Sequence, residues 1–164
     1  MSNESRQFFS KSVIRASLAL SITSGVLSVL GSTTTIVVIL RSPKRFNSTY
    51  RRLVFGMSCM DILFSLSYVA AGLPAPKDMA SWMSLNAIGN IATCNMQGFI
   101  NHSGLIGSLL YACMLSIYFV MVVVYSHREN FVQKKIEPFF HALSILISLG
   151  SGVFLMVTNN FNDG

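Results

Sequence analysis

No charged side chain interrupts residues 16–40, which read ASLALSITSGVLSVLGSTTTIVVIL. As an α-helix, about 25 residues extend roughly 38 Å, which is enough to cross the hydrocarbon core of a bilayer with some tilt. A cleavable signal peptide has an apolar region of only about 7–15 residues, so this run is too long for one. Residues 16–40 therefore predict a transmembrane helix that stays in the protein.

The composition of the whole chain also indicates that lipid is its solvent. Of 164 residues, 52% are hydrophobic and 11% are charged, against about 25% charged residues in an average soluble domain. Mean hydropathy is +0.57. The net charge of +6 lies in short basic clusters between apolar runs, which is the pattern of membrane loops rather than of a nucleic-acid-binding surface. We expect an integral, multi-pass membrane protein that contacts membrane lipid and no nucleic acid.

Three further apolar runs follow the first. The second ends where Pro74 and Pro76 disfavour helix, and the fourth follows Pro138, a residue suited to the first turn of a helix. The sequence predicts an all-α membrane protein, a transmembrane bundle of about four helices at residues 16–40, 53–73, 88–125 and 139–157. The transmembrane domain is expected over residues 16–158, with an N-terminal segment at 1–15 and a polar tail at 159–164.

The distribution of lysine and arginine predicts the orientation, because loops rich in these residues stay in the cytoplasm. The loop after the first helix has five and the loop before the fourth has three, whereas the second loop has one and the N-terminal segment three. We therefore predict that the N-terminus and the tail are extracellular. Asn3 is then the one N-x-S/T sequon placed to carry a glycan. The cytoplasmic basic residues include Arg51, Arg52, Lys134 and Lys135.

Asp61 is the only charged residue in the second apolar run. A carboxylate at the centre of a membrane costs roughly 2.5–3.5 kcal/mol, so it should face other helices or a water-filled cavity. Ser58 and Ser65 fall on the same helix face. Two interpretations stay open: an ion or proton site that acts as a polar switch, or a carboxylate bonded to serines as packing between helices.

A polar stripe also follows one face of the third predicted helix. Amide and hydroxyl groups in hydrocarbon need partners, so these side chains either line a ligand cavity open to the outer side or bond to neighbouring helices. The residues of this candidate ligand cavity are Gln97, Asn101, Ser108 and Tyr111. On the first and fourth helices the small residues share faces that favour close helix packing.

The chain shows no pattern typical of an enzyme. The three histidines lie far apart on different segments, and neither a phosphate-binding glycine loop nor a nucleophile elbow occurs. The cysteines Cys59, Cys94 and Cys113 have no metal-binding spacing. We expect no catalytic residue, no metal and no cofactor.

Several stretches together resemble the first half of a seven-helix G-protein-coupled receptor. Residues 50–58, YRRLVFGMS, lead into residues 60–65, MDILFS, in the manner of the second helix of these receptors. Trp82 lies in the short outer loop before Cys94, which opens the third helix, as the family leads one to expect. Residues 94–99, CNMQGF, and 115–118, LSIY, are most similar to cAMP-receptor-like and related protist receptors.

One departure decides the branch of the family. Rhodopsin-type receptors close the third helix with an acidic-Arg-aromatic triplet, whereas this chain has Tyr118-Phe119-Val120 at that place. The chain is therefore similar to the cAMP-receptor-like or secretin-like side. The resemblance implies a disulfide from Cys94 to a cysteine in the loop after the fourth helix. It further implies that residues 1–164 are a fragment or an early-stopped product that lacks helices five to seven.

Three functions follow from these patterns. The first is a receptor in the plasma membrane that binds an unknown small extracellular ligand and signals to a heterotrimeric G protein, with Asp61 in a polar, sodium-binding switch. The second is a non-signalling four-helix membrane scaffold, or a truncated partner that forms homo- or hetero-oligomers with full-length receptors. A transporter half ranks third, because transporters also place carboxylates at mid-membrane but use broken helices that this sequence lacks.

Overall fold

The computed structural model describes residues 3–43, 46–70, 89–125 and 131–158. This part of the chain is helical nearly throughout, and the all-α class that the sequence predicts is confirmed. There are also two five-residue π-helical turns, of which η1 extends α3 and η2 leads into α5. The elements in chain order are α1 (Asn3–Arg41), α2 (Thr49–Val69), α3 (Ile91–Phe119), η1 (Val120–Val124), η2 (Val132–Ile136) and α5 (Glu137–Val157).

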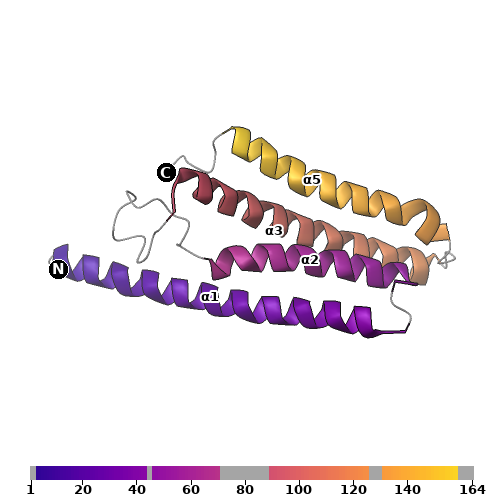
Figure 1. Ribbon diagram of the computed structural model, residues 1–164, viewed down its shortest axis with the longest axis horizontal. Coiled ribbons are helices and arrows are strands. Elements are labelled where there is room, and N and C mark those ends of the chain that lie inside the picture. The colour runs from indigo at the N-terminus through magenta and orange to yellow at the C-terminus, as the bar shows by residue number, and fades with distance from the viewer. Residues whose placement is uncertain (1–2, 44–45, 71–88, 126–130, 159–164) are drawn as a thin grey trace.

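The helices run antiparallel and pack in the order in which they occur in the sequence (Figure 1). Helix α1 packs on α2, α2 on α3, and α3 on α5. Because the helices alternate in direction, the start of α1 and the end of α5 lie at the same end of the bundle. We call this the Cys94 end. The opposite end, the basic end, carries Arg41, Arg51, Arg52, Lys134 and Lys135.

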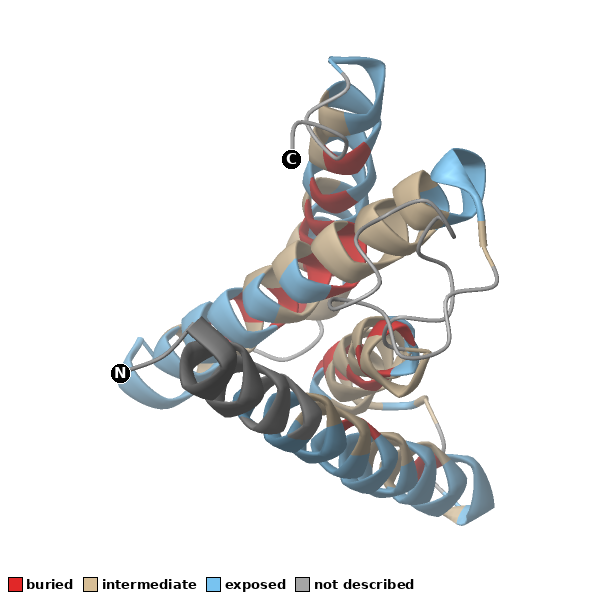
Figure 2. Cartoon of the chain, turned by 90° about the vertical axis from the view of Figure 1, so that its left-hand side faces the viewer, coloured by how far each residue is buried: buried red, intermediate tan, exposed pale blue. Residues whose placement is uncertain are grey.

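Each of the four segments is long and apolar enough to cross a membrane. The candidate spans within the described ranges are Ala16–Arg41, Thr49–Val69, Ile91–Val124 and Val132–Val157. Their outer faces are lined by exposed large hydrophobic residues such as Leu20, Leu146 and Val157. Figure 2 shows long exposed stretches on α1, α3 and α5, whereas α2 is mainly of intermediate burial. So much exposed apolar surface requires a lipid solvent. The chain is an integral, multi-pass membrane protein.

The helix boundaries differ from the sequence prediction in ways that local residues explain. The predicted transmembrane run at residues 16–40 agrees with the candidate span Ala16–Arg41. Helix α1 itself extends back to Asn3, since residues 1–15 contain no proline or glycine that would stop it. Helix α2 begins at Thr49, after Ser48 in an extended conformation, rather than at residue 53. Its predicted end at residue 73 lies outside the described residues.

The third and fourth helices also begin at residues with a specific role. Helix α3 starts at Ile91 because Asn90 caps it, with its side chain accepting from the backbone N–H of Thr93 while the Thr93 hydroxyl accepts from the backbone N–H of Asn90. The fourth helical segment starts at Val132, before the predicted residue 139, and ends at Val157 as predicted. Its π-helical first turn allows Pro138 to follow without a lost hydrogen bond inside a regular helix.

Glycines let α2 and α3 approach closely. A Cβ built at Gly104 would lie 2.6 Å from the backbone nitrogen of Phe64, and one at Gly107 would lie 2.8 Å from the sulfur of Met60. Both distances are far below van der Waals contact. At Gly104 the nearest atoms met belong to the backbone, so only glycine fits there, whereas at Gly107 the flexible Met60 side chain would have to move. In a membrane, small residues of this kind allow the backbone-to-backbone packing that holds helices together.

The buried hydrophobic core lies towards the basic end. It joins residues of α2, α3, η2 and α5, and so connects three of the four helical segments. Its members are Leu53, Tyr111, Met114, Tyr118, Val132 and Phe140.

Candidate functional site: a buried carboxylate cluster at the basic end

Glu137, the first residue of α5, is a buried carboxylate held by two residues of α2. Its residue is 5% exposed. Thr49 Oγ1 donates to Glu137 Oε2 at 2.7 Å. Arg52 donates from Nε to Glu137 Oε1 and from Nη2 to Oε2 at 2.8 Å, which is a bidentate ion pair. Such forked pairs are the strongest and most directional that side chains make.

The cluster continues through a histidine to the third helix. His141 lies one turn after Glu137 on α5, and its Nε2 atom is 3.7 Å from Glu137 Oε1. On the other side of the ring, Nδ1 shares a 2.9 Å hydrogen bond with the hydroxyl of Tyr111, which is 3% exposed. We call Thr49, Arg52, Glu137, His141 and Tyr111 the Glu137 cluster. It joins α2, α5 and α3 in one polar network.

Further groups fix the arginine of the cluster. Arg52 Nη1 donates to the backbone carbonyl of Phe46 in the loop before α2. The carboxamide of Gln133, with its oxygen turned towards Arg52, accepts at 3.2 Å from Nη1 and 2.8 Å from Nη2. The Arg52 side chain is only 23% exposed as a result. Arg52 therefore faces protein rather than the lipid head groups or protein partner that its place in a basic loop predicts.

The chemistry of this cluster suits a structural switch. Its carboxylate is charge-paired and hydrogen-bonded, and such a pair is costly to break because either partner alone would be left buried and uncompensated. The cluster also holds three helices together near one end of the bundle. A stimulus that separates α2 from α5 would have to break this pair. The pair can therefore separate two arrangements of the bundle in free energy, one with α2 and α5 joined and one with them apart.

Sequence reasoning missed Glu137, His141 and Thr49 as members of a site. Glu137 stands at the edge of an apolar run, where an acidic residue is ordinarily solvated. The one local indication is that His141 follows Glu137 by four residues, which places both on one helix face. The partners on α2 precede Glu137 by 85 and 88 residues, and no local pattern connects them.

Asp61, by contrast, lies where its residue type predicts, between helices. It is half-buried on α2 and accepts a hydrogen bond from Ser108 Oγ of α3. Ser65 Oγ donates to Ser28 Oγ of α1 at 2.7 Å, and Ser58 is buried. This face of α2 therefore contacts two neighbouring helices, and the hydroxyl of Ser108 belongs to the Asp61 site.

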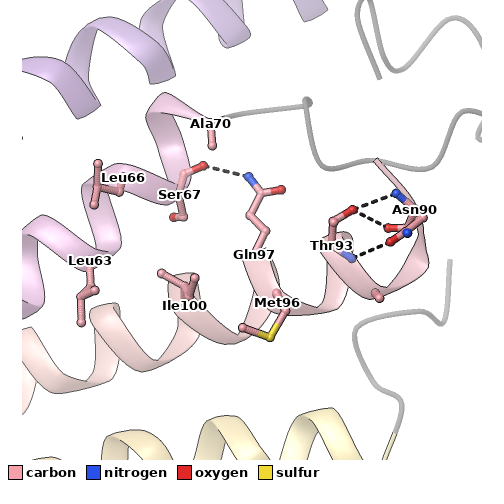
Figure 3. Close-up of a pocket in the computed structure, with 10 residues that line it drawn as sticks. Leu63, Leu66, Ser67, Ala70, Asn90, Thr93, Met96, Gln97 and Ile100 are labelled. Atoms are coloured by element: carbon pink, nitrogen blue, oxygen red, sulfur yellow. Dashed lines mark hydrogen bonds between the residues drawn. The ribbon is translucent and has the colours of Figure 1, made fainter. Parts of the chain in front are cut away.

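A cavity of about 590 Å³ opens between α2 and α3 near the Cys94 end. Figure 3 shows Gln97 between the two helices, with its Nε2 donating to the backbone carbonyl of Ser67 at 2.8 Å. The rest of the lining is mainly apolar and includes Leu63, Leu66 and Met96. The volume lies within the range of about 300–1,000 Å³ that is usual for small-molecule sites.

Of the four residues predicted to border a ligand cavity, Gln97 lines this one. Ser108 and Tyr111 are engaged with Asp61 and His141 instead, so the polar stripe of α3 serves three separate contacts. Asn101 lies half-buried on α3, and the next residue, His102, bonds through Nε2 to Ser151 Oγ of α5 at 3.1 Å.

The other predicted residues occupy the two ends. Cys94 is a half-buried free thiol in the first turns of α3. Lys134 and Lys135 are exposed on η2. Trp82 lies outside the described residues, and so does the side chain of Asn3, whose backbone begins α1.

Among the described residues, His, Cys, Asp and Glu side chains form no group of three or more that could hold a metal ion.

Comparisons with known proteins identify no relative of this chain. The chain matches no model of a protein family, no curated protein and no solved structure.

Proposed function

We propose that this chain forms helices one to four of a seven-helix receptor of the cAMP-receptor-like or secretin-like type. In this proposal the protein lies in the plasma membrane with its N-terminus outside, binds a small extracellular ligand and signals to a heterotrimeric G protein. The observation that carries the proposal is that α2 and α3 line the cavity near the Cys94 end and also contribute Arg52 and Tyr111 to the Glu137 cluster near the basic end.

This shared pair of helices gives a physical route between the two ends. A ligand that enters between Leu66 of α2 and Gln97 of α3 changes how the two helices pack. The same displacement at the basic end changes the geometry of the Arg52–Glu137 ion pair. A ligand shifts such an equilibrium only by its difference in affinity for the two arrangements, and a buried ion pair makes the arrangements energetically distinct.

Nucleotide exchange on a purified heterotrimeric G protein tests the proposal without a known ligand. Membranes from cells that express the complete product of the transcript encoding this chain are mixed with the G protein, and binding of a non-hydrolysable GTP analogue is followed. We expect Glu137→Gln to raise basal exchange above wild type because it weakens the bond between α2 and α5. The matched control is Lys135→Gln, which removes an exposed charge at the same end. The proposal is contradicted if neither the wild-type receptor nor its Glu137→Gln variant raises exchange above that of membranes without the receptor.

The transcript that encodes the chain supplies a second, independent test. Three further apolar spans after Gly164, with a cysteine before the first of them, are the result that the receptor proposal requires. A stop codon at that position in the native transcript contradicts signalling through a complete receptor.

A second candidate function is a non-signalling scaffold or receptor partner. It is favoured by Gly31 on α1 and Gly150 on α5, beside which a Cβ would meet no atom within 4 Å. Small residues on outer faces allow another transmembrane helix to approach closely. Energy transfer between two labelled copies of the chain in one membrane tests this. The scaffold proposal requires a signal that Gly31→Leu or Gly150→Leu reduces and that unlabelled copies compete away.

A further inference from the structure

A second cavity, of about 360 Å³, lies at the basic end between α1 and α2. The side chains that line it change from mainly apolar to polar along the length of the cavity. Towards the middle of the bundle it is formed by aliphatic and threonine side chains, and towards the end by groups that donate hydrogen bonds. The lining residues are Thr34, Thr35, Val38, Ile39, Ser42, Tyr50, Arg51 and Val54.

Arg51 supplies a positive charge to the polar part of this cavity. Its side chain is held by a hydrogen bond from Nη1 to Ser42 Oγ, across the gap between α1 and α2. This contact uses one of the five N–H groups of a guanidinium. The planar fork of arginine is suited to holding phosphate oxygens on two further N–H groups.

The two neighbouring arginines of α2 differ in what balances their charge. Arg52 points towards α5 and is paired with Glu137. Within the described ranges, Glu137 pairs with Arg52 and lies near the ring of His141, so Arg51 meets a serine hydroxyl where Arg52 meets a carboxylate. Among the described residues the charge of Arg51 has no carboxylate partner, so it is available to an external anion.

The position of the cavity also favours the binding of an anion. Arg51 and Tyr50 stand in the first turn of α2, a helix of 21 residues, and the N-terminus of a helix favours negative charge. The cavity also lies within the lipid-facing surface, since Val38 is 62% exposed. The polar groups at the membrane edge match the head group of a phospholipid, and the apolar groove that runs inwards matches its acyl chain.

We infer that the cavity between α1 and α2 binds an anionic phospholipid of the leaflet at the basic end. Its phosphate lies beside Arg51 and Ser42, and the start of an acyl chain lies along Val38 and Val54. Basic pockets between transmembrane helices are known to select such head groups. This inference does not depend on whether the protein is a receptor.

Mass spectrometry of the intact protein with its retained lipids tests the site. The protein is purified in detergent from an equimolar mixture of phosphatidylserine and phosphatidylcholine. We expect wild type to retain phosphatidylserine preferentially. Arg51→Ala should lower this retention about fivefold, which corresponds to the roughly 1 kcal/mol that one basic residue contributes at an anionic surface. Lys134→Ala is the matched control, because it removes the same charge from an exposed position on η2 and should leave retention unchanged.

Three outcomes overturn the inference. Equal losses for Arg51→Ala and Lys134→Ala would show diffuse attraction rather than a site. Release of the phosphatidylserine by inorganic phosphate alone would show a site for a free anion instead of a lipid. If Arg51→Ala does not fold, Val54→Trp fills the apolar part of the cavity and keeps Arg51, and unchanged retention in this variant would exclude the acyl-chain placement.

Discussion

Glu137 combines two properties that are costly together at the edge of a membrane, since it is a carboxylate and is 5% exposed. The cost is offset by Arg52 and Thr49, which between them bond to both carboxylate oxygens. Removal of either charge of a buried pair leaves the other uncompensated, whereas removal of both is far less harmful. This asymmetry makes the pair testable.

We predict that Glu137→Gln and Arg52→Met each lower the stability of the bundle by about 2 kcal/mol, below the roughly 3–5 kcal/mol of a fully buried pair, because the Arg52 side chain is 23% exposed. The double variant should lose less than the sum of the two. Denaturation of the protein in mixed micelles measures the three free energies of unfolding, and the coupling follows from the double-mutant cycle. Strict additivity of the two losses would show that the charges do not interact.

Asp61 leads to a different prediction, which rests on its proposed role as a sodium-binding switch. Sodium chloride should raise the Tm of wild type relative to choline chloride, and Asp61→Asn should abolish this difference, because the amide keeps an acceptor for Ser108 but loses the charge that attracts the ion. Ser116→Ala is a suitable control, since that hydroxyl bonds to the carbonyl of Ala112 on its own helix. The same sodium response in wild type and Asp61→Asn would leave Asp61 with a packing role alone.

The contrast between Asp61 and Glu137 shows what the sequence can predict at the scale of single residues. Asp61 is conspicuous because it is the one charge in an apolar run, and the membrane then requires a protein neighbour for it. Which neighbour it is, Ser108, depends on the rotation of α3 about its axis and not on any local pattern. Glu137 is inconspicuous because it adjoins a basic loop, although it is more deeply buried.

At the scale of helices, the glycines of α3 make the clearest prediction. Gly104→Ala should destabilise the bundle by about 1–3 kcal/mol, which is typical of overpacking, because the new Cβ would meet the backbone of Phe64. Gly150→Ala on α5 is the matched control. It meets open space, so we expect it to be neutral or to stabilise the protein by about 0.5–1 kcal/mol through helix propensity.

The measurement for both glycine variants is the midpoint of thermal unfolding in the same detergent. A lower Tm for Gly104→Ala and an unchanged or higher Tm for Gly150→Ala are the expected result. If both variants shift Tm in the same direction by the same amount, helix propensity rather than contact between α2 and α3 governs these positions.

The spans of the helices follow from hydropathy, whereas their ends follow from particular side chains. The four apolar runs were sufficient to predict four segments of membrane-spanning length, which the structure confirms. The sequence predicts the start of α2 at residue 53, four residues too late, because Thr49 and Arg52 are polar and are also typical of a loop. They are helical because Glu137 supplies the partner that polar groups there need. Such a partner is visible only in three dimensions.

At the scale of the whole molecule, orientation in the membrane is open to direct test. We predict that Asn3 carries a glycan in eukaryotic cells, so that a glycosidase lowers the apparent mass of wild type and leaves Asn3→Gln unchanged. In a variant that lacks the native cysteines, Lys134→Cys should react with a membrane-impermeant thiol reagent only after the cells are permeabilised. Reaction of that cysteine in intact cells would show that the orientation is opposite to the predicted one.

The row-like packing of the bundle has a consequence for biosynthesis. The main neighbours in space are also neighbours in sequence, since α1 packs on α2, α2 on α3 and α3 on α5, whereas α2 and α5 share a smaller contact. As the ribosome delivers the chain, α1 leaves the translocon before its one main neighbour exists and stands alone among lipids until α2 arrives. For each later helix the main packing partner is already in the membrane, so the bundle can assemble in the order of its synthesis.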